Sequence, residues 1–192
     1  FLFNGFSVFS TEYNNESAET ISVLEDGRIM VGGHIGNEIG TDGLIIVLNS
    51  NGTLDTNFGD NGIWRINREG IDTSKIRKIM VGDTGEIIIA GDINYITPEN
   101  TRMFLCKLSF EGNYLTEFGE NGCFIANEFT EFKDVNFYNN QYIILSQGQS
   151  MVYDPRRDLW RAVSSLNIYT LDIDGVQLEE ITKMNNLTGE SI

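Results

Sequence analysis

The chain has very little material for metal-dependent or histidine-based chemistry, because its 192 residues include one His and two Cys. Basic residues are also scarce: 13 Lys and Arg stand against 28 Asp and Glu, which gives a formal net charge of −15. A surface of that charge repels phosphate backbones and anionic lipids, so we expect no nucleic-acid partner. No apolar run approaches the ~18–20 residues of a transmembrane helix, so we expect no membrane insertion.

Helical periodicity is missing as well. Nothing from Gly5 to Ile181 sustains the apolar spacing of an amphipathic helix, so we expect almost no helix. What the chain does have is 20 Gly and 11% aromatic residues, with only two Pro. This composition indicates short strands joined by many tight turns.

The chain repeats itself with a period close to 60 residues. Residues 25–33, which read Glu-Asp-Gly-Arg-Ile-Met-Val-Gly-Gly, match residues 83–91, and residues 51–62 match residues 111–122. A fixed period of this length is the signature of a repeat architecture.

A third, degenerate copy follows, and a trace of another precedes the first. Residues 139–145 match the hairpin of the earlier copies, and Asn4-Gly5-Phe6 lines up with Asn61-Gly62-Ile63. We therefore treat residues 1–192 as a single repeat domain that begins in the middle of a repeat. Its parts are the strand of a preceding repeat at 1–10, repeat 1 at 20–67, repeat 2 at 75–127 and a degenerate repeat 3 at 131–192.

Each copy predicts four short strands, with the first two flanking a turn pair such as Asp26-Gly27. The second strand is almost continuously apolar at Ile29–Val31, Ile87–Ile89 and Ile143–Leu145, which indicates strands covered on both faces. Four antiparallel strands per repeat form the blade of a β-propeller. The predicted fold class is all-β and β-propeller-like, with about three four-stranded antiparallel blades plus an extra N-terminal strand. Because propellers typically close with about four to eight blades, we expect a ring not closed by this chain alone, with two exposed apolar faces.

At these residues the sequence resembles the delta-60 repeat, a β-propeller-like family found mostly in bacterial secreted and surface proteins. The family pattern is a P-D-G-K-I-V-V-A-G hairpin followed by an N-x-D-G-S-L-D-x-x-F-G-x-x-G block. This chain has the hairpin at residues 25–33 and the block at Asn49–Gly62. The resemblance covers residues 20–127 well and 128–184 loosely. It implies an extracellular or cell-surface location in bacteria and no shared catalytic activity. A place in a virion is an alternative location that we also consider.

The matching residues are explained by structure alone. We expect Phe58 and Phe118 to plug the seams between blades, and Asp55 or Thr56 to accept hydrogen bonds from turn amides. Trp64 falls in a short outer strand, so we expect it to pack at the blade surface.

The two cysteines fall on strand positions of the repeat. Cys106 and Cys123 align with Ile46 and Ile63 of the first copy, so we expect both to be small buried core residues. The two strands can be neighbours in one blade, which would allow a disulfide, but the sequence leaves open whether the bond forms.

No catalytic or metal-binding constellation is evident. His34 has no second imidazole and no Ser or Cys motif beside it, so we expect a solvated loop residue. Asp172–Gly175 and Asp55–Gly62 lack the ligand spacing of a calcium loop. Phosphate-binding, serine-hydrolase, zinc-protease and sialidase-like motifs are missing too. We expect no enzyme activity, no catalytic residue, no metal and no cofactor.

The most individual segment is the long connection Gln147–Arg161 in the third copy, which concentrates Arg, Tyr and Trp in an acidic chain. These residue types are enriched at interface hot spots. The segment corresponds to the connections 35–43 and 93–101, so we expect all three to emerge on one rim. An alternative is a lid that covers the degenerate blade. The candidate ligand- or partner-binding residues are Tyr153, Asp154, Arg156, Arg157, Trp160, Tyr95, Arg102 and His34.

Two functions fit these observations. The first is a non-enzymatic structural or interaction module: a partial propeller that docks with other domains or subunits in a bacterial surface, secreted or virion-type assembly. Its partner would be another protein or further repeats that complete the ring. The alternative is a propeller that binds, or hydrolyses, a glycan or peptide with its rim loops, where aromatic rings stack on sugars and Arg binds carboxylates.

Overall fold

A computed structural model describes residues 16–36, 40–66, 70–95, 101–127, 130–180 and 184–185. Within these ranges the chain has thirteen β-strands and no helix, so the prediction of an all-β fold is confirmed. No helix that could cross a membrane occurs in this part of the chain. The strand predicted at residues 1–10 lies outside the described residues.

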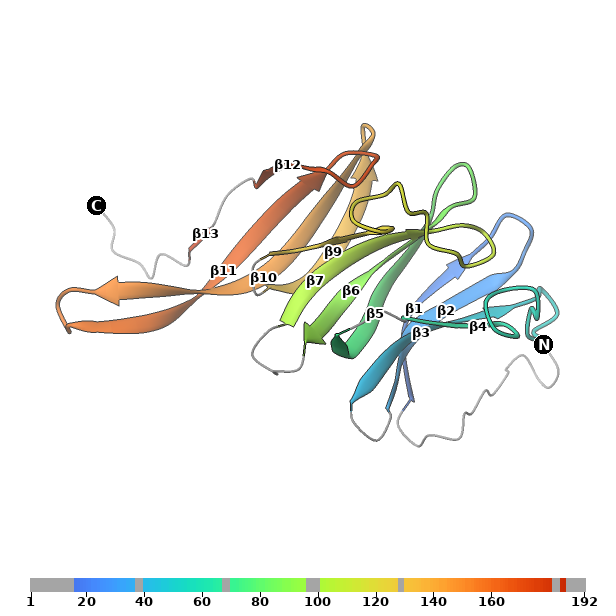
Figure 1. The fold of residues 1–192 in the computed structure, drawn as a ribbon, viewed down its shortest axis with the longest axis horizontal. Coiled ribbons are helices and arrows are strands. Elements are labelled where there is room, and N and C mark those ends of the chain that lie inside the picture. The colour runs from blue at the N-terminus through green and yellow to red at the C-terminus, as the bar shows by residue number, and fades with distance from the viewer. Residues whose placement is uncertain are drawn as a thin grey trace.

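The strands form three antiparallel sheets that follow one another along the chain (Figure 1). Sheet 1 has the order β1 (Glu16–Val23), β2 (Ile29–Gly36), β3 (Thr41–Leu48) and β4 (Ile63–Arg65). Sheet 2 repeats this order with β5 (Ile71–Val81), β6 (Ile87–Tyr95), β7 (Thr101–Leu108) and β8 (Cys123–Ile125). Sheet 3 consists of β9 (Thr130–Tyr138), β10 (Gln141–Asp154), β11 (Leu159–Leu171) and β12 (Gln177–Glu180), and β13 (Met184–Asn185) also pairs with β11. None of the three closes into a barrel.

The sheets stack face to face, with sheet 2 in the middle. Strand β5 contacts β1, β2 and β3, and β9 contacts β5, β6 and β7. Consecutive first strands therefore touch, and the sheets converge along that edge, as the blades of a propeller do around its axis. The chain is thus a partial β-propeller of three blade-like sheets.

The first hairpin of each sheet turns on the pair that the sequence indicates. In sheet 3 this pair is Asn139-Asn140, with φ angles of 51° and 60°. Asn tolerates the left-handed region better than other non-Gly residues, so it can replace the Gly27 and Gly85 of the earlier copies.

The middle sheet is buried on both faces, which explains its continuous apolar run. Ile87 and Ile89 pack toward sheet 1, whereas Ile88 and Ala90 pack toward sheet 3. Coverage of both faces is confirmed for this strand but not for Ile143–Leu145 in sheet 3, where Ile143 and Leu145 are exposed.

Trp64 and the connection Gln147–Arg161 do not lie as predicted. Trp64 is only 8% exposed and belongs to the core between sheets 1 and 2, with its ring 5.6 Å from that of Tyr114. The segment Gln147–Arg161 is not a long loop, because β10 and β11 pair without interruption from Tyr142↔Leu171 to Asp154↔Leu159. Only residues 155–158 form the turn between these strands.

Cys106 and Cys123 form a disulfide, which answers the question that the sequence left open. They lie directly opposite one another on β7 and β8, and both are buried as predicted. The equivalent pair in sheet 1 is Ile46↔Ile63, which occupies the same ladder position without a covalent bond.

We expect replacement of both cysteines by Ser to lower the free energy of unfolding by ~2–4 kcal/mol, the usual contribution of a disulfide. The matched variant Cys106→Ile/Cys123→Ile copies the pair of sheet 1 and should recover part of this loss through apolar burial. Urea denaturation with and without reductant measures both effects. Identical denaturation midpoints for the oxidised and reduced wild-type chain would contradict the expectation.

Candidate functional site

The seams between sheets share one contact, made by the Phe-Gly pairs of the repeat. Phe58 and Phe118 are almost fully buried, which confirms their predicted role as seam plugs. Beside each Phe, the next Gly donates a backbone hydrogen bond across the seam: Gly59 N to Glu111 O at 3.2 Å, and Gly119 N to Asp174 O at 2.7 Å. The same latch therefore joins sheet 1 to sheet 2 and sheet 2 to sheet 3.

Each plug fits over a glycine with a positive φ in the following sheet. Gly112 has φ +91°, and a Cβ added there would lie 3.3 Å from the Phe58 ring. Gly175 has φ +79°, and a Cβ there would lie 2.8 Å from the Phe118 ring. The glycine thus supplies both the turn conformation and the space for the ring.

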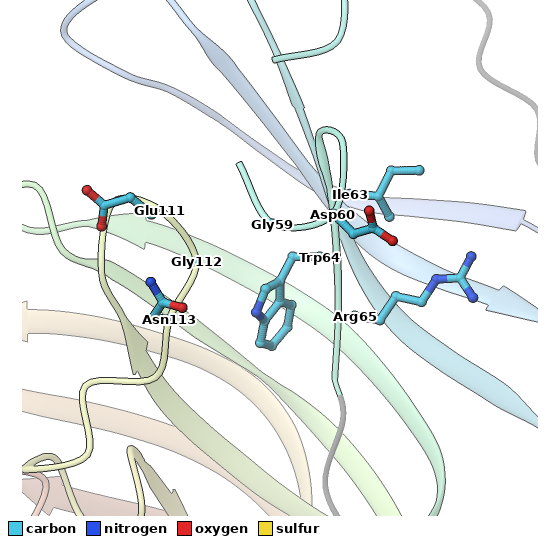
Figure 2. A pocket seen from close by; sticks show the side chains of 8 residues that line it. All are labelled: Gly59, Asp60, Ile63, Trp64, Arg65, Glu111, Gly112 and Asn113. Atoms are coloured by element: carbon cyan, nitrogen blue, oxygen red, sulfur yellow. The ribbon is translucent and has the colours of Figure 1, made fainter. Parts of the chain in front are cut away.

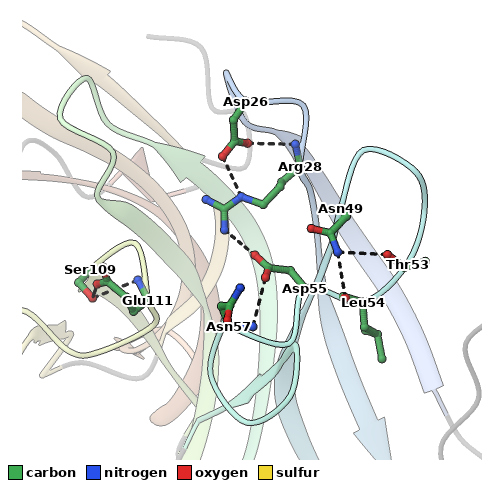
Figure 3. Close-up of polar contacts among 9 residues, drawn as sticks. All are labelled: Asp26, Arg28, Asn49, Thr53, Leu54, Asp55, Asn57, Ser109 and Glu111. Carbon is green, nitrogen blue, oxygen red and sulfur yellow. Dashed lines mark hydrogen bonds and ion pairs between the residues drawn. The ribbon is translucent and has the colours of Figure 1, made fainter.

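The first seam has an additional charged contact centred on Arg28 (Figure 3). The Arg28 guanidinium donates to Asp26 at 2.9 Å and to Asp55 at 2.6 Å, and its carbon lies 3.8 Å from the centroid of the Phe110 ring in sheet 2. Asp55 also accepts a bond from the backbone N of Asn57, so its predicted contact with a turn amide is confirmed. The hydrogen bond from Arg28 is the main cause that lowers the pKa of the buried Asp55 carboxyl.

A second polar network connects all three sheets. Arg77 of sheet 2 contacts Glu19 of sheet 1 at 3.4 Å and Asp92 of its own sheet at 3.1 Å. Asp92 in turn accepts a 2.7 Å hydrogen bond from the backbone N of Phe132 in sheet 3. Burial raises the pKa of the Asp92 carboxyl, while the bonds from Phe132 and Arg77 oppose that shift.

The second seam contains a patch of buried polar side chains. Thr130 Oγ1, Ser146 Oγ and Asn167 Oδ1 are buried without a hydrogen-bond partner. In the first seam the position equivalent to Asn167 is the buried Phe104. Each unpaired buried group costs about 1–3 kcal/mol. The first seam contains such atoms too, Arg28 Nη2 and His34 Nδ1, so this cost is not confined to the second seam.

We call the side of each sheet that points toward the next sheet its receiving face. In sheet 2 this face consists of Ile88, Ala90, Met103 and Leu105, all at most 3% exposed beneath sheet 3. The same positions in sheet 3, counted from the hairpin turn and the strand register, are Ile143, Leu145, Leu166 and Ile168. They are also apolar, yet Ile143, Leu145 and Leu166 are 36%, 37% and 46% exposed.

The opposite side of each sheet, which packs on the preceding sheet, is its docking face. Ile79 of sheet 2 and Val135 of sheet 3 lie on this face and are nearly fully buried. The equivalent residue of sheet 1 is Ile21, which is 67% exposed, as is Val23 beside it. Ile21 at one end of the stack and the receiving face of sheet 3 at the other therefore expose apolar side chains at positions that the inner seams bury, whereas Ile35 and Leu44, on the same face of sheet 1 as Ile21, are buried.

The residues predicted as one binding rim do not form a single site in the described structure. His34 is not a solvated loop residue as predicted: it lies in β2 facing the first seam, with Nδ1 3.7 Å from Glu19 Oε1. Burial is the main cause that lowers its pKa. Tyr95 and Arg102 lie together at the ends of β6 and β7, with the guanidinium 5.6 Å from the ring centroid. The predicted common rim depends on residues 37–39 and 96–100, which lie outside the described residues.

The remaining candidates lie at the end of the β10–β11 hairpin. Tyr153 and Trp160 are paired across the two strands, Asp154 ends β10, and Arg156 and Arg157 occupy the exposed turn. Pairing of β10 with β9 ends at Gly148↔Thr130, so the hairpin continues beyond the sheet as a two-stranded arm, which Figure 1 shows extending to the left. We call residues 149–164 the arm.

A hollow of about 630 Å³, which the sequence did not indicate, lies in the first seam (Figure 2). Its lining includes Trp64 and Arg65 of β4 on one side and Glu111 and Asn113 of the β7–β8 connection on the other. Figure 2 shows Arg65 pointing away from Trp64, on the other side of the strand. The sequence gives one sign that the two seams differ here. The residues of the second seam that are equivalent to Trp64 and Asn113 are Phe124 and Val176. Because Trp64 is nearly buried, the hollow offers little aromatic surface to a ligand.

Metal ligands do not cluster in the part of the chain that the structure describes. There, no three His, Cys, Asp or Glu side chains come close enough together to hold a metal ion.

Comparison with known proteins supports the repeat. The model of a family described as a domain of unknown function (DUF5122) beta-propeller matches residues 24–58, which run from the first hairpin of sheet 1 to the Phe58 plug. Over this segment the resemblance to a β-propeller repeat is confirmed. None of the curated proteins matches the chain, and none of the solved structures does.

The fit of the plug can be tested with a pair of glycines that have the same backbone conformation. Gly175→Ala and Gly85→Ala both place a side chain at a positive φ, at a cost of about 1–2 kcal/mol. Only Gly175→Ala also crowds the Phe118 ring, since a Cβ at Gly85 meets nothing closer than 3.8 Å. We expect Gly175→Ala to be the more destabilising variant by ~1–3 kcal/mol in urea denaturation. Equal losses would show that the plug does not depend on the glycine.

The Arg28–Asp55 pair predicts a pH-dependent effect. Arg28→Met leaves the buried Asp55 carboxylate unpaired, and we expect a loss of ~3 kcal/mol in unfolding free energy at neutral pH. Because the folded pKa of Asp55 lies below the ordinary value of 3.8 for this side chain, the stability from this pair is present above that value and is lost as the pH falls through the folded pKa. Denaturation as a function of pH should show the difference between wild type and Arg28→Met shrinking below pH 3.8. In an Asp55→Asn background, Arg28→Met should lower the free energy of unfolding by less. If the loss caused by Arg28→Met in the wild-type background does not depend on pH, the ion pair is not its cause.

Proposed function

We propose that the chain is a non-enzymatic interaction module, a partial β-propeller whose terminal sheets dock with other domains or subunits. The observation that carries this proposal is the receiving face of sheet 3. Its residues are apolar at the same positions as in sheet 2, but they are exposed instead of buried. Contiguous apolar surface of this kind marks interaction sites in soluble proteins.

The energetic incentive to cover this face is moderate. Full burial of an aliphatic side chain contributes ~1.5–3 kcal/mol, so covering the exposed part of Ile143, Leu145 and Leu166 would contribute about 1 kcal/mol each. Ile21 and Val23 at the other end of the stack add more. A partner with a matching apolar sheet would therefore gain free energy by covering one of these faces. A face that stays in water favours association with other apolar surfaces.

The charged groups of the described residues support a structural role. Arg28 pairs with Asp55, Arg77 with Asp92 and Lys107 with Glu86, and the first two pairs belong to the networks that cross the seams. As a setting for such a module we propose a bacterial surface, secreted or virion-type assembly, on the strength of the repeat resemblance.

The proposal is tested by making the receiving face of sheet 3 polar. We expect wild-type chain to bind the apolar dye ANS and to associate in sedimentation velocity over the micromolar range. Leu145→Lys/Leu166→Lys should abolish both without lowering the free energy of unfolding, because the two side chains are already exposed. Ile173→Lys/Val176→Lys is the matched control, since these exposed residues lie in the connection between β11 and β12. Dye binding that is the same in all three proteins would exclude this face as a docking surface.

A further inference from the structure

His34 is the one histidine of the chain, and it lies in the first seam. Its side chain is 13% exposed, and Nδ1 has no hydrogen-bond partner among the described residues. The residue opposite it on β3 is Gly43, whose backbone N donates a 2.7 Å hydrogen bond across the seam to Ser74 Oγ. A titratable group therefore lies beside a contact that joins sheet 1 to sheet 2.

The charged groups around His34 come from both sheets of the seam. On β1, Glu19 Oε1 lies 3.7 Å from Nδ1, and on β5 of sheet 2 the positive charges of Lys75 and Arg77 act on the imidazole. Asp42 of β3 falls on the opposite face of sheet 1, because side chains alternate along a strand. Burial is the largest cause that lowers the pKa of His34; the two cations lower it further, and Glu19 opposes them.

Glu19 is shared between His34 and the next sheet. Its Oε2 lies 3.4 Å from Arg77 Nη1 across the seam. Arg77 has a second carboxylate partner, Asp92, whose Oδ2 lies 3.1 Å from Nε. In the part of the chain that the structure describes, Glu19 is the one carboxylate within ion-pair distance of His34. Because an enclosed charge without a partner is costly, a protonated imidazole needs Glu19 more than Arg77 does.

We propose that His34 is an acid-sensitive switch in the first seam: while it is neutral Glu19 pairs with Arg77, and when it is protonated Glu19 pairs with it instead and sheet 1 is held less tightly on sheet 2. The ion pair that crosses the seam then becomes an ion pair within sheet 1, since Glu19 and His34 belong to the same sheet. The new positive charge also repels Lys75 and Arg77 of sheet 2. The switch acts between sheets 1 and 2, so it is independent of what the receiving face of sheet 3 binds.

The repeat restricts this switch to the first seam. Counted from the hairpin turn, the position of His34 is Asp92 in sheet 2 and Gln147 in sheet 3. Asp92 accepts a 2.7 Å hydrogen bond from Phe132 N across the second seam, and Gln147 does not titrate. Three consecutive sheets thus carry an imidazole, a carboxylate and an amide at one position, and acid adds a charge only to the imidazole.

Acid therefore acts with opposite sign on the two seams. Because the pKa of His34 in the folded chain lies below its ordinary value of 6.5, the stability that the neutral imidazole contributes is present above pH 6.5 and is lost as the pH falls through the folded pKa. Burial raises the pKa of Asp92, so protonation of that carboxyl favours the folded chain. Mild acid should loosen the first seam and leave the second closed.

Proton NMR of the full chain measures the titration directly, because a single histidine gives a single Cε1–H signal. We expect a midpoint below 6.5 in the wild type. Glu19→Gln removes the facing carboxylate and should lower the midpoint further, whereas Arg77→Gln removes a facing cation and should raise it. A wild-type midpoint at or above 6.5, or one that neither substitution moves, would overturn the proposal.

Hydrogen exchange then measures whether the seam loosens. The reporter is Gly43 N, which bonds across the first seam, and the internal control is Gly119 N, which bonds across the second. We compare protection factors, which correct for the intrinsic pH dependence of exchange. Between about pH 7.5 and about pH 5 we expect the protection of Gly43 N to fall ~10-fold and that of Gly119 N to stay unchanged or rise.

His34→Gln is the matched control variant, because it copies Gln147 of sheet 3 and does not titrate. It should make the protection of Gly43 N independent of pH over the same range. A pH-dependent loss that persists in His34→Gln would belong to another group, such as Glu19, and would overturn the proposal. Equal protection of Gly43 N at both pH values in the wild type would overturn it as well.

Discussion

Each sheet of this chain is apolar on both faces, so none of them can leave both faces in water. Among the described residues, only sheet 2 has both faces covered by neighbouring sheets, with sheet 1 on one side and sheet 3 on the other. Most other features follow from that packing: the continuous apolar second strand, the convergence of β1, β5 and β9, and the exposed apolar residues at the two ends of the stack. An array of this kind becomes fully buried only when its ends are covered as well.

The two seams share their backbone latch but differ in what surrounds it. The first adds the Arg28–Asp55 pair and the contact with Phe110, whereas the second contains buried oxygens without partners. The latch sets the spacing of the sheets, and the side chains around it set how tightly each seam holds. Sheet 3 combines an exposed apolar receiving face with the projecting arm.

Much of the fold could be predicted from the sequence because the signals are local and repeated. The turn pairs, the apolar strands and the plugs Phe58 and Phe118 each occur at a fixed distance from the next copy. The errors concern pairings between distant residues. A three-residue strand does not reveal which face Trp64 takes. The turn residues Pro155–Asp158 predict a loop, but nothing local shows that the strands on either side stay paired up to Asp154↔Leu159. The disulfide and the Arg28–Asp55 pair depend on strand register and on contacts across a connection, which no local pattern encodes.

The central claim is that the exposed apolar receiving face of sheet 3 is a docking surface. Binding of the dye ANS tests it most directly, because ANS binds exposed apolar surface. We expect wild-type chain and Ile173→Lys/Val176→Lys to bind the dye, and Leu145→Lys/Leu166→Lys to lose this binding. Equal dye binding by all three proteins would contradict the claim.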